Sequence, residues 1–395
     1  MGIPLTNPVP NSTILPPNTT ELVLTLQSVA ATTCRYAIAS APDYDAMTPF
    51  DSGAGTRQHS VVLRGLSPDP NVVNDVYVRC SADPSFVLHL RYRSLSIANP
   101  SYPRTGNLWG YEYELKDLTN CAKIDLWLGA TWFSPSQIRQ LRTLNPNIRV
   151  LTSINAVENS DLPDDYYLKD IHGNRVEVWP GSYRLNLTKP YVAEYQARYA
   201  CQRILDSDLM MDGCFFDNVM LSQSWQTRDM YGNPFLYDAN EDGIEDDPAV
   251  LDASWKAGVI HEIEVFRRLM PNAIVSGHSA EIEEPAVANA FNGKSFGFRT
   301  ADVLENRMCF SELWDLYQAW MTQARTPNVT MFESSPQEQI SYGYGYAPWN
   351  NTPTSTLDFA QSYFPYVRFG LALTLMQDGF FAHEYGDTWH GNAWW

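Results

Sequence analysis

The 395-residue sequence has no apolar run near the length of roughly 20 residues that a membrane-spanning helix needs, so we expect no membrane span. It is also poor in basic residues, with 27 Lys and Arg against 45 Asp and Glu and a net charge of −18. This charge disfavours binding to nucleic acid or to an anionic membrane surface. The composition instead favours action on neutral or cationic ligands, and it leaves the oligomeric state open.

Several motifs of catalysis and cofactor binding are missing. The six cysteines form no C-x-x-C pair, which disfavours a structural zinc site. The seven histidines form neither H-x-x-x-H nor H-E-x-x-H, which disfavours a metal-dependent hydrolase such as a deacetylase. No glycine-rich phosphate loop follows the first predicted strand. We therefore expect no organic cofactor.

The chain is long enough for two domains, and the first is predicted to be all-β. Residues 1–20 are proline-rich and are expected to form an extended lead-in. Residues 21–97 contain short alternating runs separated by turn residues, which predicts a β-sandwich. Within it, residues 61–68 followed by Val76-Tyr77-Val78 resemble a fibronectin type III module.

Cys34 and Cys80 both fall in this first region. They are expected either to form a disulfide between the two sheets or to remain as buried free thiols. A disulfide would imply export from the cytoplasm.

Residues 103–395 alternate between predicted strands and helices, which is typical of a (β/α)₈ barrel. The predicted fold class is therefore multidomain, with an all-β sandwich followed by an α/β barrel. The eight predicted strands are Lys123–Leu128, Ile148–Ile154, Arg184–Leu187, Gly213–Val219, Ala273–Ser276, Asp302–Glu305, Val329–Glu333 and Phe380–Glu384.

Acidic residues close four of these apolar runs, and polar or aromatic residues lie at the ends of others. Barrel active sites are built where strands end, and hydrolysis of a glycosidic bond needs two carboxyl groups there. The candidate acids are Asp217, Glu305, Glu333 and Glu384. The candidates for contact with a sugar are Asn155, Asn186, Asn218, His278, Trp127 and Trp132, each of which equally suits a bracing or packing role.

A resemblance to a known family follows from residues 212–219, which read D-G-C-F-F-D-N-V. This segment resembles the DG-x-FFDN signature of a hypothetical bacterial glycosyl hydrolase family, as do residues 185–188, 303–305 and 389–395 more weakly. The resemblance implies a glycosidase with a fibronectin-like leader before a barrel, without naming the sugar. Because members continue past the final tryptophan pair, it also implies a truncated C-terminus.

Two assignments of the catalytic pair follow. By analogy with barrel glycosidases that act on α-linked sugars, Asp217 is expected to be the nucleophile and Glu305 the acid/base. In the alternative, Glu333 is the nucleophile and an acid on the fourth strand donates the proton. We expect the first pair, because Asp217 lies in the strongest motif. A barrel that binds carbohydrate without cleaving it is the alternative function.

An acidic segment after the fourth strand resembles a calcium loop. Residues 238–247 place oxygen ligands at alternate positions, with Gly243 allowing the turn. The twelfth position is Ala249 instead of Glu, so Asp247 is expected to substitute; the alternative is a solvated acidic loop. The predicted ligands are Asp238, Asn240, Asp242, Ile244, Asp246 and Asp247. A structural calcium ion would favour a secreted protein, extracellular or periplasmic, whose signal peptide has been removed.

Overall fold

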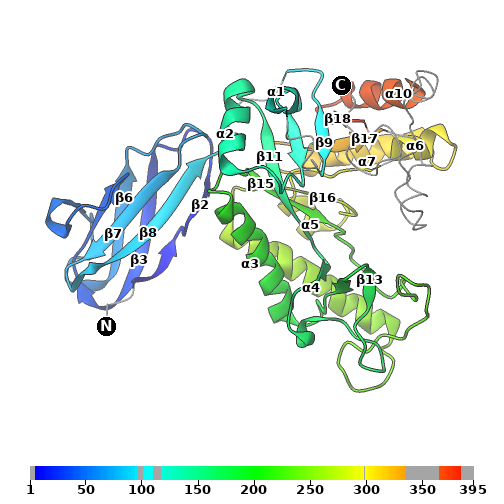
Figure 1. Cartoon of the computed structure of the whole chain (residues 1–395), viewed down its shortest axis with the longest axis horizontal. Helices are drawn as coiled ribbons and strands as arrows, with labels where there is room; N and C mark the ends of the chain where they lie inside the picture. The colour runs from blue at the N-terminus through cyan, green and yellow to red at the C-terminus, as the bar shows by residue number, and fades with distance from the viewer. Residues whose placement is uncertain (1–4, 97–100, 110–116, 298, 335–363, 384–395) are drawn as a thin grey trace.

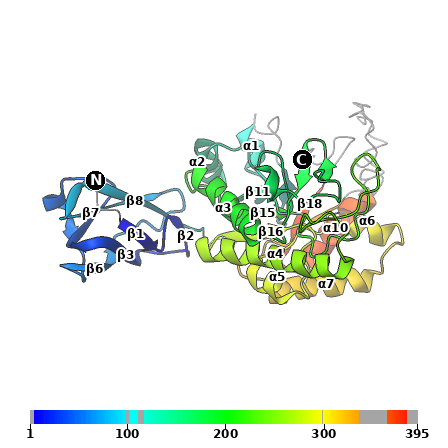
Figure 2. The same ribbon diagram turned by 90° about the horizontal axis from the view of Figure 1, so that it is seen from below.

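The computed structural model describes residues 5–96, 101–109, 117–297, 299–334 and 364–383. The chain folds into an all-β part near its N-terminus and an α/β part that lies beside it (Figures 1 and 2). None of the helices within the described residues has the length and hydrophobicity needed to cross a membrane.

The all-β part has two sheets that share one core. Leu24 and Val61 of one sheet and Val76 and Leu90 of the other are all buried in that core. The strand order is β1(Leu5–Val9)-β3(Glu21–Thr32)-β6(Thr56–Arg64) in one sheet and β2(Thr13–Leu15)-β8(Asp83–Ser94)-β7(Asn74–Cys80)-β4(Cys34–Ile38)-β5(Thr48–Pro49) in the other. Strands β3, β4, β6, β7 and β8 confirm the prediction that residues 21–97 are rich in short strands.

Residues 1–20 were expected to be an extended lead-in before the sandwich, but part of this segment belongs to the sandwich itself. β1 pairs with β3 and β2 pairs with β8, so residues 5–15 belong to the two sheets. β1 and β2 are both edge strands, where a missing proline N–H costs no ladder hydrogen bond. Proline content therefore misled the prediction.

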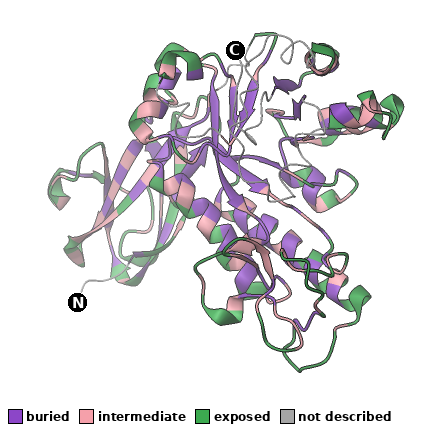
Figure 3. Ribbon diagram, turned by 45° about the vertical axis from the view of Figure 1, so that its right-hand side comes forward, coloured by how far each residue is buried: buried purple, intermediate pink, exposed green. Residues whose placement is uncertain are grey.

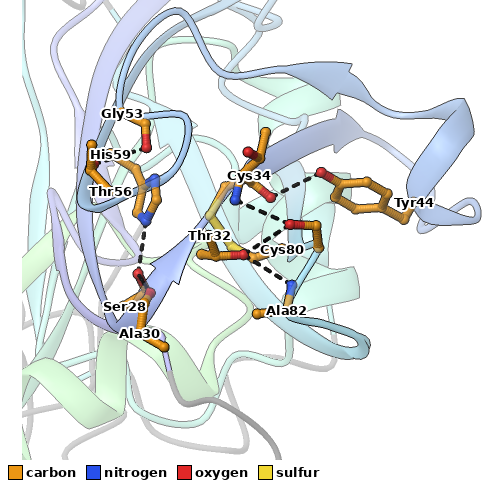
Figure 4. Close-up of a disulfide and its surroundings, with 12 residues drawn as sticks. Ser28, Ala30, Thr32, Cys34, Tyr44, Gly53, Thr56, His59, Cys80 and Ala82 are labelled. Atoms are coloured by element: carbon orange, nitrogen blue, oxygen red, sulfur yellow. Dashed lines mark hydrogen bonds between the residues drawn. A yellow bond between two sulfur atoms is a disulfide. The ribbon is translucent and has the colours of Figure 1, made fainter.

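Cys34 and Cys80 form a disulfide (Figure 4). They lie directly opposite each other in the antiparallel pair β4–β7. The bond therefore joins neighbouring strands of one sheet, which differs from both alternatives that the sequence left open, a bond between the two sheets and two free thiols.

The α/β part is built on parallel strands. Five of them follow the order β16(Ile274–Gly277)-β15(Gly213–Asp217)-β11(Arg149–Asn155)-β10(Leu126–Leu128)-β9(Gly106–Leu108), and β17(Met331–Glu333) pairs with β18(Phe380–Ala382). The α-helices are α1(Leu118–Cys121), α2(Pro135–Leu144), α3(Pro190–Asp206), α4(Pro248–Leu269), α5(Pro285–Ala290), α6(Arg299–Leu304), α7(Phe310–Gln323) and α10(Phe364–Leu375). The strands are largely buried, whereas the helices expose their outer faces (Figure 3).

Further hydrogen bonds connect these two sheets at both of their edges. The Phe381 N–H donates to the carbonyl of Arg104 at 2.8 Å, which joins β18 to the chain just before β9. Residues 292–296 lie between β16 and β17, because Asn292 N donates to the Val275 carbonyl at 2.7 Å and Met331 N donates to the Lys294 carbonyl at 2.9 Å. Within the described residues, eight parallel segments therefore follow one another in a closed order.

Two predicted strands were wrong and two segments of the ring were missed. Residues 302–304 belong to helix α6, and the sixth segment is residues 292–296. Strand β14(Ser182–Arg184) lies in a separate antiparallel sheet with β12(Glu158–Asn159) and β13(Glu177–Trp179). The first segment, β9, is three residues long and gave no periodic signal. Before Asp217, the prediction missed one segment of the ring, β9, and counted one strand that lies outside the ring, β14. These two errors cancel, so Asp217 still ends the fourth segment.

Glu262 of α4 is a buried acid in the core of the α/β part. Within the described residues neither of its carboxyl oxygens has a hydrogen-bond partner. Burial raises the pKa of Glu262 well above its ordinary value of 4.5, because the charged form loses its hydration. As pH rises, the unfolded chain loses this proton near pH 4.5, whereas the folded protein keeps it up to the raised pKa. The contribution of the neutral carboxyl to the free energy of unfolding is therefore fully present below pH 4.5 and is lost as pH rises toward the raised pKa of the folded state.

We expect the Glu262→Gln variant to be more stable than the wild type above neutral pH. The difference in unfolding free energy grows with pH by up to about 1.4 kcal/mol per pH unit until the raised pKa is reached. Urea unfolding between pH 5 and pH 9 measures it, with Glu264→Gln on the exposed face of the same helix as control. A difference that stays constant with pH would contradict this account.

Candidate active site

Four side chains meet at the end of the ring where the parallel strands have their carboxyl ends. Asp217 is the last residue of β15, and Glu333 is the last residue of β17. His278 directly follows β16, and Ser295 lies in segment 292–296. This end of the ring is called the mouth below, and it is where enzymes built on rings of parallel strands carry their active sites.

His278 connects the two acids at the mouth. Its Nδ1 lies 3.1 Å from Oδ1 of Asp217, and its Nε2 lies 3.2 Å from Oε1 of Glu333. The Ser295 hydroxyl donates to the same Glu333 oxygen at 2.5 Å. The edge of Phe215 packs against the imidazole, with ring centroids 5.0 Å apart. We call these the Asp217–His278–Glu333 group.

The electrostatics of this group make His278 an imidazolium. Burial opposes the charge on the ring, but hydrogen bonds to Asp217 and Glu333, together with their negative charges, raise the pKa of His278 to about 10. At neutral pH both ring nitrogens therefore carry protons and donate, one to each carboxylate.

The exposure of the two acids separates their roles. The side chain of Glu333 is 0% exposed, whereas that of Asp217 is 18% exposed. A ligand entering the mouth can therefore reach Asp217, while Glu333 lies behind the imidazole. Glu333 is placed to orient and charge His278, and His278 in turn to hold Asp217.

The predicted asparagines divide between the mouth and the loops. Asn218 adopts a left-handed conformation with φ of 57° and donates to Oδ2 of Asp217 at 3.2 Å. Asn155 is the register partner of Asp217, and its side chain accepts a hydrogen bond from the N–H of Val157 at 3.0 Å. Asn186 is buried and donates to the carbonyl of Ala239 at 2.8 Å, so it braces a loop. Asn218 thus joins the candidate site directly.

Two of the remaining predicted residues have other contacts, one is exposed, and one lies outside the described residues. Glu305 follows helix α6, where its carboxylate pairs with Arg307 and accepts a hydrogen bond from Tyr366 at 2.9 Å. Glu384 lies outside the described residues. Trp127 is 1% exposed and packs against Phe133 in the core, which is the packing role that the sequence left open for it. Trp132 is 55% exposed, and its role stays a prediction.

Sequence reasoning missed Glu158 and Ser295. Glu158 lies beyond β11 in the short strand β12, 12% exposed at its side chain, with Nη1 of Arg184 at 3.1 Å. Ser295 lies in a segment without an apolar run, which hid the sixth strand position. Neither residue closes a recognisable strand, so the search for acids at strand ends could not find them.

The calcium-like loop folds around Asp238. Its two carboxylate oxygens accept hydrogen bonds from the N–H groups of Asp242 at 3.0 Å and Gly243 at 2.8 Å. Asp247 was expected as a ligand, but it caps helix α4 by accepting from the N–H of Ala249 at 2.9 Å. In the described part of the chain, no group of three or more His, Cys, Asp or Glu side chains is arranged to hold a metal ion. Calcium binding stays a prediction.

Residues 142–379 match hypothetical glycosyl hydrolase family 15. No curated protein matches the chain. Among solved structures, the glycoside hydrolase domain of PelA from Pseudomonas aeruginosa is 12% identical, with 60% of this chain and 87% of that chain covered and a TM-score of 0.40.

Two larger glycosidases are also similar to the chain. A GH2 beta-galacturonidase from Eisenbergiella tayi is 8% identical, with 92% of this chain and 61% of that chain covered and a TM-score of 0.44. The GH36 alpha-galactosidase AgaA from Geobacillus stearothermophilus is 10% identical, with 91% and 52% covered and a TM-score of 0.43. No conclusion about a substrate follows from similarity at this level.

Proposed function

The chain belongs to hypothetical glycosyl hydrolase family 15, and on that premise we propose that it hydrolyses glycosidic bonds at the mouth of the ring. The observation that carries the proposal is the imidazole of His278 between the carboxylates of Asp217 and Glu333. Asp217 is the central carboxylate, which attacks the anomeric carbon or activates a water for that attack.

The proposed chemistry uses the neighbours of Asp217 to position it. The imidazolium of His278 and the amide of Asn218 donate to different oxygens of Asp217, which fixes the plane of its carboxylate. A nucleophile or base held in one orientation reacts faster, because its conformational entropy is lost on folding and not on reaching the transition state. Glu333 acts through His278 and does not contact the sugar.

We further propose that the ring is a (β/α)₈ barrel and that the all-β part is fibronectin-like. The closed order of eight parallel segments with helices between most of them supports the barrel. The expectation of α-linked substrates depended on an acid at the sixth segment, where this chain has Ser295. The proposal is therefore limited to glycosidic bonds of either configuration.

We propose that the protein works outside the cytoplasm, in an extracellular or periplasmic compartment. The Cys34–Cys80 disulfide supports this, since disulfides persist mainly in oxidising compartments.

The function is tested by incubating the protein with a panel of neutral and amino-sugar polysaccharides and measuring released reducing ends. We expect cleavage of at least one polysaccharide. Binding of a polysaccharide without release of reducing ends would favour the alternative, a carbohydrate-binding scaffold.

Calcium is expected to stabilise the protein through loop 238–247. Adding millimolar calcium to chelator-treated protein should raise its Tm by a few degrees, because binding to the folded state alone stabilises that state. The measurement is a thermal melt, and magnesium is the control ion. The control variant is Asp242→Asn, which removes the charge of a predicted calcium ligand. An equal Tm with and without calcium would contradict the prediction.

A further inference from the structure

Glu158 lies beside Asp217 because of the path that the chain takes beyond β11. The N–H of Ala156 donates to the carbonyl of Asp217 at 2.8 Å, so the chain leaving β11 passes across the end of β15. Two residues later, Glu158 pairs with Arg184 in the antiparallel sheet β12-β14-β13. This small sheet holds Glu158 at the edge of the mouth.

The environment of the Glu158 carboxyl differs from that of Asp217. Arg184 lies 3.1 Å from one oxygen, and the Ser182 hydroxyl donates to the other at 3.3 Å. Burial is the largest influence and raises the pKa of Glu158; the negative charge of Asp217 adds to this, while Arg184 opposes it. Two neighbouring carboxyl groups with different environments are the usual arrangement for an acid and a base in one site.

We propose that Glu158 is the proton donor to the leaving group in the glycosidic cleavage for which Asp217 supplies the carboxylate. This inference rests on the proposed function. The bond between the anomeric carbon and the glycosidic oxygen breaks, its electron pair goes to that oxygen, and the oxygen takes the proton of Glu158. At the same carbon a bond forms to Asp217, or to a water that Asp217 deprotonates.

The other acids are less suited to this role. Glu333 has no exposed surface, and His278 lies between it and Asp217. Glu305 is paired with Arg307 beyond helix α6. A donor must reach the leaving oxygen, and among the acids that the structure describes, Glu158 lies next to Asp217 and keeps some exposure.

The test compares wild type, Glu158→Gln and Glu305→Gln on two kinds of substrate. One is the polysaccharide that the panel identifies, and the other is the 4-nitrophenyl glycoside of the same sugar, whose leaving group departs without a proton. We expect Glu158→Gln to lose roughly 10²- to 10⁴-fold in kcat/KM on the polysaccharide and less than about tenfold in kcat/KM on the nitrophenyl glycoside, because kcat/KM reports the first bond cleavage even where Glu158 acts as a base in a later step. Glu305→Gln should retain both activities.

The retained nitrophenyl activity also shows that the variant has folded and that Asp217 is intact. If Glu158→Gln lost the same activity on both substrates, the role of Glu158 would be overturned while the proposed function stayed in place. The same would follow if Glu305→Gln, and not Glu158→Gln, lost activity on the polysaccharide alone. A wild type that cleaves neither substrate would contradict the proposed function itself.

Discussion

The Asp217→Asn variant is expected to lose glycoside hydrolysis, with kcat falling on the order of 10⁴-fold or more. Asparagine has the same shape, and its amide oxygen still accepts from His278 at the position of Oδ1. The negative charge that attacks carbon or takes a proton from water is gone. The measurement is the rate of reducing-end release at saturating polysaccharide.

The control is Asp161→Asn, which makes the same chemical change at an exposed aspartate and should leave kcat unchanged. Asp217→Asn is expected to lose some unfolding free energy, because Asn218 loses the oxygen to which it donates and His278 loses one of its two negative partners; urea unfolding should show that the variant is still folded. A folded Asp217→Asn variant with wild-type kcat would show that another residue carries the reaction.

The second large effect is expected at Asp212, where replacement by alanine should cost about 3–5 kcal/mol of unfolding free energy. Asp212 is 2% exposed, and its carboxylate lies 2.8 Å from Nη2 of Arg93 and 2.9 Å from Nη2 of Arg142. Burial opposes its charge, but the two arginines and the N–H of Val150 hold the pKa of Asp212 below its usual range. Removing Asp212 leaves two buried guanidinium groups without this partner.

This loss is large beside the 5–15 kcal/mol by which proteins are usually stable. Asp208→Ala is the matched control, because Asp208 also pairs with two arginines but is 41% exposed. Its cost should stay within about 1 kcal/mol. Urea unfolding of both variants measures the difference, and equal small losses would contradict the structural role of Asp212.

Asp212 also adds to the interpretation of the sequence motif. Residues 212–219 were interpreted as a family signature with Asp217 as its catalytic acid, and the other acid of the motif has a different task. Arg93 comes from β8 of the all-β part, so Asp212 fastens that part to the α/β part. Asp217 stands at the opposite end of the same strand, at the mouth. A motif shows which residues occur together, but not which end of a strand each serves.

The sequence was sufficient to place Asp217, Glu333 and His278 at strand ends, because each follows an apolar run long enough to recognise. It could not show that His278 bridges the two acids, since this depends on the order of strands around the ring. The sequence did not reveal two short segments of the ring, because β9 has three residues and 292–296 has no apolar run. The sixth position was therefore assigned to residues that form helix α6.

Glu158 escaped prediction for a different reason. It follows a strand end by three residues, and only the pairing of β12 with β14 buries it beside Asp217. Such a placement depends on a contact between segments about 25 residues apart, which periodicity within one segment does not contain.

The most direct test of the central claim is a crystal structure of Asp217→Asn with an oligosaccharide of the cleaved polysaccharide bound. We predict that the sugar lies in the mouth, with its anomeric carbon next to residue 217 and its glycosidic oxygen facing Glu158. An oligosaccharide bound only elsewhere on the molecule, with the mouth inaccessible to it, would contradict the account.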